Sequence, residues 1–168
     1  MTPAVHREAL RSVAEVFDRH DIQYLVVGGA AVILHGYFRL TSDRHGVPVD
    51  KVDLDLWFNP TLNNYYPLLR ALEELGFDVS RIRRLEIVDP ASRFLKFATD
   101  TYTLDLLPKY PGVGTFREAR SRAMLADLGD LVVPVISYDD LVNNKLAAAR
   151  AKDLADLEGL RSARGEDD

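Results

Sequence analysis

Three aspartates in apolar segments are the residues of this sequence whose types and spacing suggest chemistry. Asp53 and Asp55 alternate with apolar residues at the start of the segment 52–58, so their carboxylates project from one face of a strand, about 6.7 Å apart along it. Asp105 occupies the same kind of position in the segment 103–106. Carboxylates on neighbouring strands repel one another unless cations lie between them, and Mg²⁺ or Mn²⁺ prefers such oxygen ligands. The pattern predicts bound divalent ions that assist an in-line phosphoryl displacement.

A glycine pair supplies the second half of the predicted site. Gly28 and Gly29 follow the apolar run 24–27 and precede the helix-like stretch 30–35, which predicts a buried strand, a tight turn and a helix. Glycines let the backbone approach a phosphate closely, and N–H groups at a helix start attract anions. We therefore expect a nucleoside triphosphate to lie between this turn and the metal-loaded aspartates.

The aspartates and two cations of the C-terminal segment have distinct expected roles. Asp53 and Asp55 hold the metal pair, while Asp105 shares a metal and helps to deprotonate an acceptor hydroxyl, which attacks the α-phosphate. Lys145 and Arg150 are the candidate cations for the charge that develops on the departing pyrophosphate. The alternative for Lys145 is an ordinary solvated helix lysine.

The remaining segments predict the elements that position these residues. Helices are expected over residues 3–19, 30–35, about 66–75, 116–126 and one or two within 138–160, and strands over 24–27, 52–58, 85–88, 94–98, 102–107 and 131–136. The connections between the strands from 85 to 107 are too short for helical crossovers, so these strands are predicted to be antiparallel. The tail 161–168 is expected to fray.

Length and composition set the protein class. The chain has 168 residues, 21 basic and 26 acidic side chains, a formal charge of −5 and 47% hydrophobic residues, which predicts a single domain over 1–168. The absence of cysteine excludes disulfides and cysteine zinc sites. Mild acidity argues against binding of duplex DNA. No apolar run approaches about 20 residues and no leader pattern opens the sequence, so a cytoplasmic protein without membrane contact is expected.

The run around the glycine pair and the first two aspartates resembles a known family signature. It comprises Tyr24-Leu25-Val26-Val27-Gly28-Gly29-Ala30-Ala31-Val32, then His35-Gly36-Tyr37, Arg39 and Thr41, then Val52-Asp53-Leu54-Asp55-Leu56-Trp57. With a third acid on a later strand, it looks like the signature of minimal nucleotidyltransferases of the DNA polymerase β superfamily. The resemblance covers about residues 22–160 and implies an α+β fold, a short mixed β-sheet with helices packed on it. It also implies transfer of a nucleoside monophosphate from a nucleoside triphosphate such as ATP, with release of pyrophosphate.

Within that family, the sequence looks most like bacterial proteins related to abortive-infection nucleotidyltransferase toxins. Their C-terminal Arg-x-Lys-Asp-x-x-Asp element is matched here by Arg150, Lys152, Asp153 and Asp156. The likeness implies nucleotide contacts for Arg150 and Lys152, and a toxin-like role of the kind found in toxin–antitoxin pairs. Asp153 and Asp156 also fit a structural salt-bridge face of a helix. Related small nucleotidyltransferases often complete their sites across a dimer, so the resemblance also implies a homodimer.

One departure from the family pattern precedes the first two aspartates. Close relatives begin this strand a residue or two after the position of Thr41, whereas here residues 42–51 intervene as an insertion. Asp43 would align with the first metal ligand without a gap, but no strand pattern surrounds it, so Asp53 keeps that assignment. Arg39, just before the insertion, is a candidate contact for the phosphates or for a carboxylate.

Two classes of function fit these observations. The first is a metal-dependent nucleotidyltransferase acting on the hydroxyl of a small molecule, an RNA or a protein. The basic residues between 81 and 96 are either a solvated face or a contact for an acidic acceptor such as RNA. The second is a catalytically inactive protein of the same fold that binds a nucleotide or a partner, suggested by the insertion and the small size of the chain.

Overall fold

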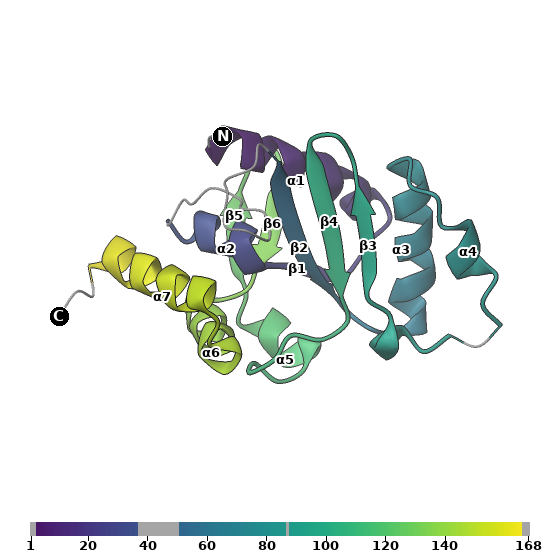
Figure 1. Cartoon of the computed structure of the whole chain (residues 1–168). Coiled ribbons are helices and arrows are strands. Elements are labelled where there is room, and N and C mark those ends of the chain that lie inside the picture. The colour runs from purple at the N-terminus through teal and green to yellow at the C-terminus, as the bar shows by residue number, and fades with distance from the viewer. Residues whose placement is uncertain (1–2, 37–50, 87, 166–168) are drawn as a thin grey trace.

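The computed structural model of the protein describes residues 3–36, 51–86 and 88–165. Its elements in chain order are α1 (Pro3–Arg19), β1 (Tyr24–Val27), α2 (Gly28–Leu34), β2 (Val52–Phe58), α3 (Leu62–Glu74), α4 (Ser80–Arg83), the short 3-10 helix η1 (Pro90–Ser92), β3 (Leu95–Ala98), β4 (Tyr102–Leu107), α5 (Phe116–Ser121), β5 (Met124–Asp127), β6 (Val132–Val135), α6 (Tyr138–Ala148) and α7 (Ala151–Arg164) (Figure 1).

A six-stranded mixed sheet in the order β3-β4-β2-β1-β6-β5 organises the fold. β2 runs parallel to β4 and antiparallel to β1, whereas β1 runs parallel to β6. β3 and β5 form the two edges as antiparallel partners of β4 and β6. The predicted α+β class with a mixed sheet and packed helices is therefore confirmed.

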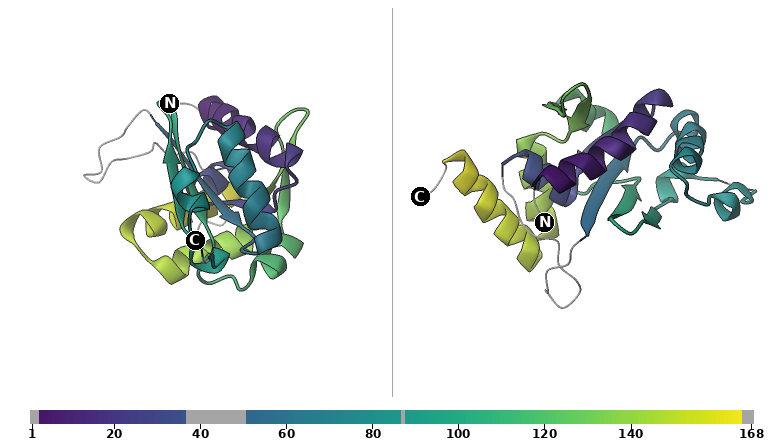
Figure 2. Two further views of the ribbon diagram at one scale, coloured as in Figure 1. Left: turned by 90° about the vertical axis from the view of Figure 1, so that its right-hand side faces the viewer. Right: turned by 90° about the horizontal axis from the view of Figure 1, so that it is seen from above.

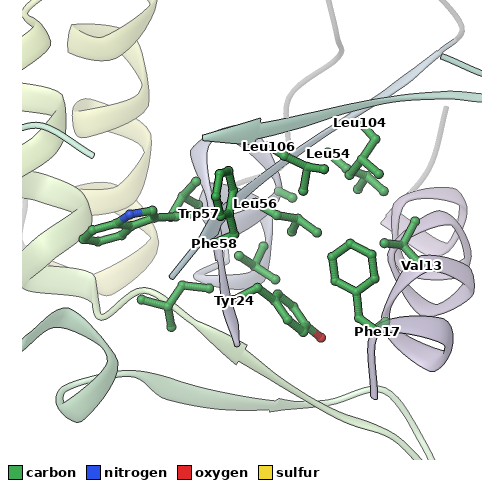
Figure 3. Packing of buried hydrophobic residues seen from close by; sticks show 14 of the residues in the cluster. Val13, Phe17, Tyr24, Leu54, Leu56, Trp57, Phe58, Leu104 and Leu106 are labelled. Atoms are coloured by element: carbon green, nitrogen blue, oxygen red, sulfur yellow. The ribbon is translucent and has the colours of Figure 1, made fainter. Parts of the chain in front are cut away.

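Alternation along β2 decides which of its side chains enter the core. Leu54 and Leu56 are fully buried, and Phe17 of α1 lies on their side of the sheet (Figure 3). Each such side chain contributes about 1.5–3 kcal/mol when it leaves water. Because successive side chains of a strand point to opposite faces, Asp53 and Asp55 project from the face that α1 does not cover.

The C-terminal helices lie at the other end of the molecule from α3 and α4 (Figure 1), and Figure 2 shows the same separation from above. Ser137 caps α6 by accepting a hydrogen bond from the N–H of Asp140. The chain then turns into α7 at Ala149, which has a left-handed backbone with φ of 49°. Across residues 3–36, 51–86 and 88–165, no helix combines the length and the apolar character needed to cross a membrane.

Two predicted elements between β2 and β6 were wrong. The described residues of the segment 85–88 form no strand and lie between the short helices α4 and η1. Before α4, Asp78 accepts a hydrogen bond from the N–H of Ser80. Leu85 is 40% exposed. Its apolar side chain therefore lies at the surface and does not pack against a sheet. The expected helix 116–126 ends at Ser121, and the following residues form the edge strand β5.

The C-terminal prediction also needs one correction. The tail was expected to fray from residue 161, but α7 continues to Arg164 and ends at Gly165 in a left-handed cap. The guanidinium of Arg164 lies 3.9 Å from the centre of the Tyr138 ring, a cation–π contact that ties the last turn of α7 to α6.

Candidate active site

Asp55 and Asp105 occupy in-register positions of the parallel strands β2 and β4. Residues in register on adjacent strands project from the same face, so the two carboxylates are direct neighbours on the face opposite the core. Asp53 lies on this face two residues earlier, in register with Thr103, and its carboxylate accepts a hydrogen bond from the Thr103 hydroxyl. The structure therefore brings the three predicted acids to one face, with Asp55 and Asp105 as the adjacent pair.

The two adjacent acids repel each other. Burial raises the pKa of Asp55 to about 6, and the charges of Asp105 and Asp53 add to the rise, while Lys152 opposes it. Burial also raises the pKa of Asp105. The positive charge of Lys96, whose Nζ lies 4.0 Å from Asp105 Oδ1, partly offsets this rise. Perturbed carboxyls of this kind cluster at functional sites, and here they indicate a place where added positive charge is favourable.

The pair meets the requirements of a magnesium or manganese ion. Asp105 Oδ1 is buried and has no hydrogen-bond partner within the described part of the chain, so a cation would satisfy it. Mg²⁺ is usually held by one or two carboxylates together with water and substrate phosphates, which Asp55 and Asp105 can supply. Among residues 3–36, 51–86 and 88–165, no three acidic or histidine side chains are placed to enclose a metal. While Asp53 is hydrogen-bonded to Thr103, the other ligands would come from phosphate and water oxygens.

Gly28 brings the backbone directly against Asp55. Its φ is +61°, in the left-handed region that favours glycine. A Cβ at this position would lie 2.2 Å from Asp55 Oδ2 and 2.9 Å from Asp55 Cβ. The predicted glycine turn therefore lies beside the predicted acids, and a side chain larger than hydrogen would push the Asp55 carboxylate aside.

Gly28→Ala is expected to lower the nucleotidyl transfer expected from the sequence by about 100-fold or more, because the new methyl group displaces a carboxylate that must be correctly placed. Gly76→Ala is the matched control, since Gly76 also has a positive φ, +94°, but nothing lies within 4 Å of its Cβ position. Both variants should lose about 1–2 kcal/mol from left-handed strain. Activity assays and thermal unfolding of both variants test this prediction. Equal activities of Gly28→Ala and Gly76→Ala would show that activity does not depend on the close approach of Gly28 to Asp55.

A cavity of about 360 Å³, here called the Asp55 cavity, lies over these residues. Its walls include the glycine pair Gly28-Gly29, the acids Asp55 and Asp105, and the cations Lys109, Lys145, Arg150 and Lys152. Asp53 is not among its lining residues. The volume is within the range of small-molecule sites, and the cavity joins the glycine turn, two of the acids and three of the predicted cations.

Lys145 is a buried ion-paired residue. It is 2% exposed, and its Nζ lies 3.1 Å from Asp153 Oδ1 and 3.0 Å from Asp156 Oδ2. Both aspartates are fully buried. The expected solvated lysine is therefore wrong, and of the two interpretations of Asp153 and Asp156, the structure shows the ion-paired one, which joins α6 to α7.

Arg150 and Lys152 are the more accessible cations of the cavity. The Arg150 side chain is 64% exposed, and its Nε donates to Asp153 Oδ2 at 2.7 Å. Burial by itself raises the pKa of Asp153, but hydrogen bonds from Arg150 and Lys145 outweigh it and lower that pKa. Lys152 is exposed, and its charge acts on both Asp55 and Asp105.

Two residue assignments from the sequence concern the insertion. Arg39 lies outside the described residues, as do Asp43 and the rest of the insertion up to residue 50. Lys51 is described and leads directly into β2.

The cavity also contains residues that the sequence did not single out. Tyr110 Oη accepts a hydrogen bond from the N–H of Gly28 at 3.1 Å. Phe94, 52% exposed, directly precedes β3 and also lines the cavity. Phe94 was predicted only as the first residue of the strand 94–98, and Tyr110 follows β4 in a segment that no periodic pattern marks.

Trp57 and His35 have structural roles in the described fold. Trp57 is 2% exposed, donates from Nε1 to the Pro108 carbonyl at 3.2 Å, and packs edge-on against Phe116. Figure 3 shows its ring turned away from Val13 and Phe17. His35 Nε2 lies 2.8 Å from the carbonyl oxygen of Ile136, and burial lowers its pKa.

Solved structures of other proteins are similar to this chain over most of its length. An antigenic nucleotidyltransferase-like protein from Paracoccidioides brasiliensis is 14% identical with a TM-score of 0.57, covering 94% of this chain and 75% of that one. The antibiotic-resistance factor ANT(2'')-Ia is 16% identical with a TM-score of 0.59, covering 98% and 86%. The protein TM1012 from Thermotoga maritima is 16% identical with a TM-score of 0.56, covering 95% and 92%.

Sequence comparison alone finds no such relationship. No protein-family model matches the chain, and no curated protein sequence matches it significantly. At the identities of the structural matches, what is shared is the arrangement of helices and strands. The chain therefore has a nucleotidyltransferase-like fold, as its sequence motifs predicted.

Proposed function

We propose that this chain is a metal-dependent nucleotidyltransferase that moves a nucleoside monophosphate from a nucleoside triphosphate to an acceptor hydroxyl, with release of pyrophosphate. The observation that carries the proposal is the in-register pair Asp55 and Asp105, set against Gly28 in a cavity that also contains Arg150 and Lys152. The nucleotidyltransferase-like fold supports it.

The reaction is a single substitution at the α-phosphorus. The acceptor O–H bond breaks, its oxygen bonds to the α-phosphorus, and the bond to the oxygen bridging the β-phosphate breaks. Mg²⁺ or Mn²⁺ held by Asp55 and Asp105 would supply positive charge to the reacting phosphate oxygens. Asp53 is two positions along the same face, where its carboxylate would complete the ligand set on leaving Thr103.

The other residues of the cavity would bind and orient the acceptor and the triphosphate. Asp105, whose carboxylate is next to Asp55, would help to take the proton of the acceptor hydroxyl. Arg150 and Lys152 at the start of α7 would bind the β- and γ-phosphates and offset the charge that grows on the departing pyrophosphate.

Binding of the four common nucleoside triphosphates, measured by calorimetry with and without Mg²⁺, tests the proposal together with pyrophosphate release in the presence of small-molecule, RNA and protein acceptors. We expect at least one triphosphate to bind only with the divalent ion and to be turned over, and Asp105→Ala to remove turnover. Equal binding in a chelator, with no transfer to any acceptor, would contradict the proposal and favour a noncatalytic nucleotide-binding protein.

A further inference from the structure

Tyr110 places a hydroxyl group inside the Asp55 cavity, next to the glycine turn. The residue follows β4, lines the cavity, and is 9% exposed. Its ring packs edge-on against Trp57, with 5.9 Å between ring centres. Trp57 is itself buried and hydrogen-bonded to Pro108, so it supports the Tyr110 ring at the wall of the cavity.

The bond to Gly28 determines what this hydroxyl offers to a ligand. Tyr110 Oη accepts the hydrogen bond from the N–H of Gly28. A phenol carries one proton, which it can donate only in another direction. Burial raises the pKa of Tyr110 further above its ordinary value, so the phenol remains a donor throughout the neutral range. The N–H of Gly28 is already hydrogen-bonded to Tyr110 and cannot also bind a ligand. The Tyr110 hydroxyl is therefore the donor that a ligand meets at this position.

The surroundings of the hydroxyl indicate the kind of group that accepts this proton. The carboxylates of Asp55 and Asp153 and the guanidinium of Arg150 act on Tyr110 through their charges. Asp55 on the sheet, Tyr110 and Arg150 at the start of α7 all line the Asp55 cavity. In the proposed function, the triphosphate would extend past Tyr110, because a metal at Asp55 would hold its α-phosphate and Arg150 would bind its distal phosphates.

We propose that Tyr110 is a phosphate-binding residue, whose hydroxyl donates a hydrogen bond to a phosphate oxygen of the nucleoside triphosphate while its oxygen holds the N–H of Gly28. The proposal rests on the proposed function for its ligand. It replaces part of the expected role of the glycine turn, since a side-chain O–H, and not the N–H of Gly28, contacts the phosphate.

Tyr110→Phe tests this role, because phenylalanine keeps the ring that packs against Trp57 and removes only the hydroxyl. A hydrogen bond to a charged phosphate corresponds to roughly 10- to 100-fold in affinity. We expect the variant to bind the preferred triphosphate, with Mg²⁺, about 10- to 100-fold more weakly by calorimetry. Inorganic tripolyphosphate should lose affinity by a similar factor, whereas the matching nucleoside should bind as it does to the wild type.

Tyr65→Phe is the control, because Tyr65 is buried on α3, outside the cavity, and its hydroxyl has no hydrogen-bond partner within the described residues. It should bind all three ligands as the wild type does. If Tyr110→Phe weakens the nucleoside as much as the triphosphate, or changes triphosphate affinity less than twofold, the phosphate contact is refuted while the proposed function stands. If the wild type itself binds no triphosphate, the proposed function fails, and this proposal fails with it.

Discussion

Replacing Asp55 by asparagine is expected to lower nucleotidyl transfer by about 1000-fold or more and, at the same time, to raise the thermal stability of the metal-free protein. Activity falls because an amide cannot replace a charged metal ligand at the reacting phosphate. Stability rises because the ionised Asp55 is buried beside Asp105 and within reach of Asp53, and the substitution removes that repulsion.

The pH dependence of the wild type follows from the same residue. Burial raises the pKa of Asp55 from its ordinary value of 3.8 to about 6 in the folded chain. At pH values between these two, the folded state therefore binds more protons than the unfolded state. Stability of the metal-free protein therefore falls as pH rises from about 4 to about 6, by roughly 2–3 kcal/mol from this group. Asp55→Asn should lose this part of the pH dependence.

Thermal unfolding from pH 4 to pH 8 in a chelator measures both effects. At pH 7 the melting temperature of Asp55→Asn should exceed that of the wild type by a few degrees, and added Mg²⁺ should stabilise only the wild type. Asp100→Asn is the control, since it removes the same charge from an exposed turn before β4. A less stable Asp55→Asn protein, or one that transfers nucleotide at the wild-type rate, would show that Asp55 is not a repelled metal ligand.

Lys145→Met and Lys152→Met are expected to fail in different ways, although the two lysines line the same cavity. Lys145→Met leaves the fully buried Asp153 and Asp156 without their shared cation. Breaking a buried pair in this way costs about 3–5 kcal/mol, so this variant should unfold at much lower denaturant concentration.

Lys152→Met should change stability by less than about 0.5 kcal/mol, since the residue is exposed. It should instead weaken triphosphate binding by about tenfold, because it removes a cation whose charge reaches Asp55 and Asp105.

Urea unfolding and calorimetric titration of both variants separate the two roles. The double variant Lys145→Met/Asp156→Leu should recover part of the stability lost by Lys145→Met, because it removes one of the two buried carboxylates that the Lys145 cation stabilises. If Lys145→Met is as stable as the wild type but binds nucleotide poorly, then Lys145 contacts the ligand, as first expected from the sequence, and the ion-paired assignment is wrong.

The central strands could be predicted because apolar and polar residues alternate over most of their length. β2 and β4 have the predicted bounds 52–58 and 102–107, since apolar and acidic residues alternate where one face is buried and the other carries the site. β5 was missed because it is an edge strand with no fully buried side chain. Its few apolar residues cannot distinguish a helix from a strand.

The site was predictable to the extent that it is local in sequence. Gly28 and Asp55 stand in recognisable patterns, and the close approach between them follows from the pairing of Val27 with Asp55. The burial of Lys145 could not be predicted, because it depends on how α7 folds back on α6. Tyr110 lies in a turn, where its contact with Gly28 joins residues far apart in the chain.

Anomalous diffraction from crystals grown with Mn²⁺ and a non-hydrolysable nucleoside triphosphate tests the central claim most directly. We expect a manganese peak within coordination distance of carboxylate oxygens of both Asp55 and Asp105, with the α-phosphate as a further ligand. A triphosphate bound elsewhere, or manganese bound without either of these two aspartates, would contradict the account.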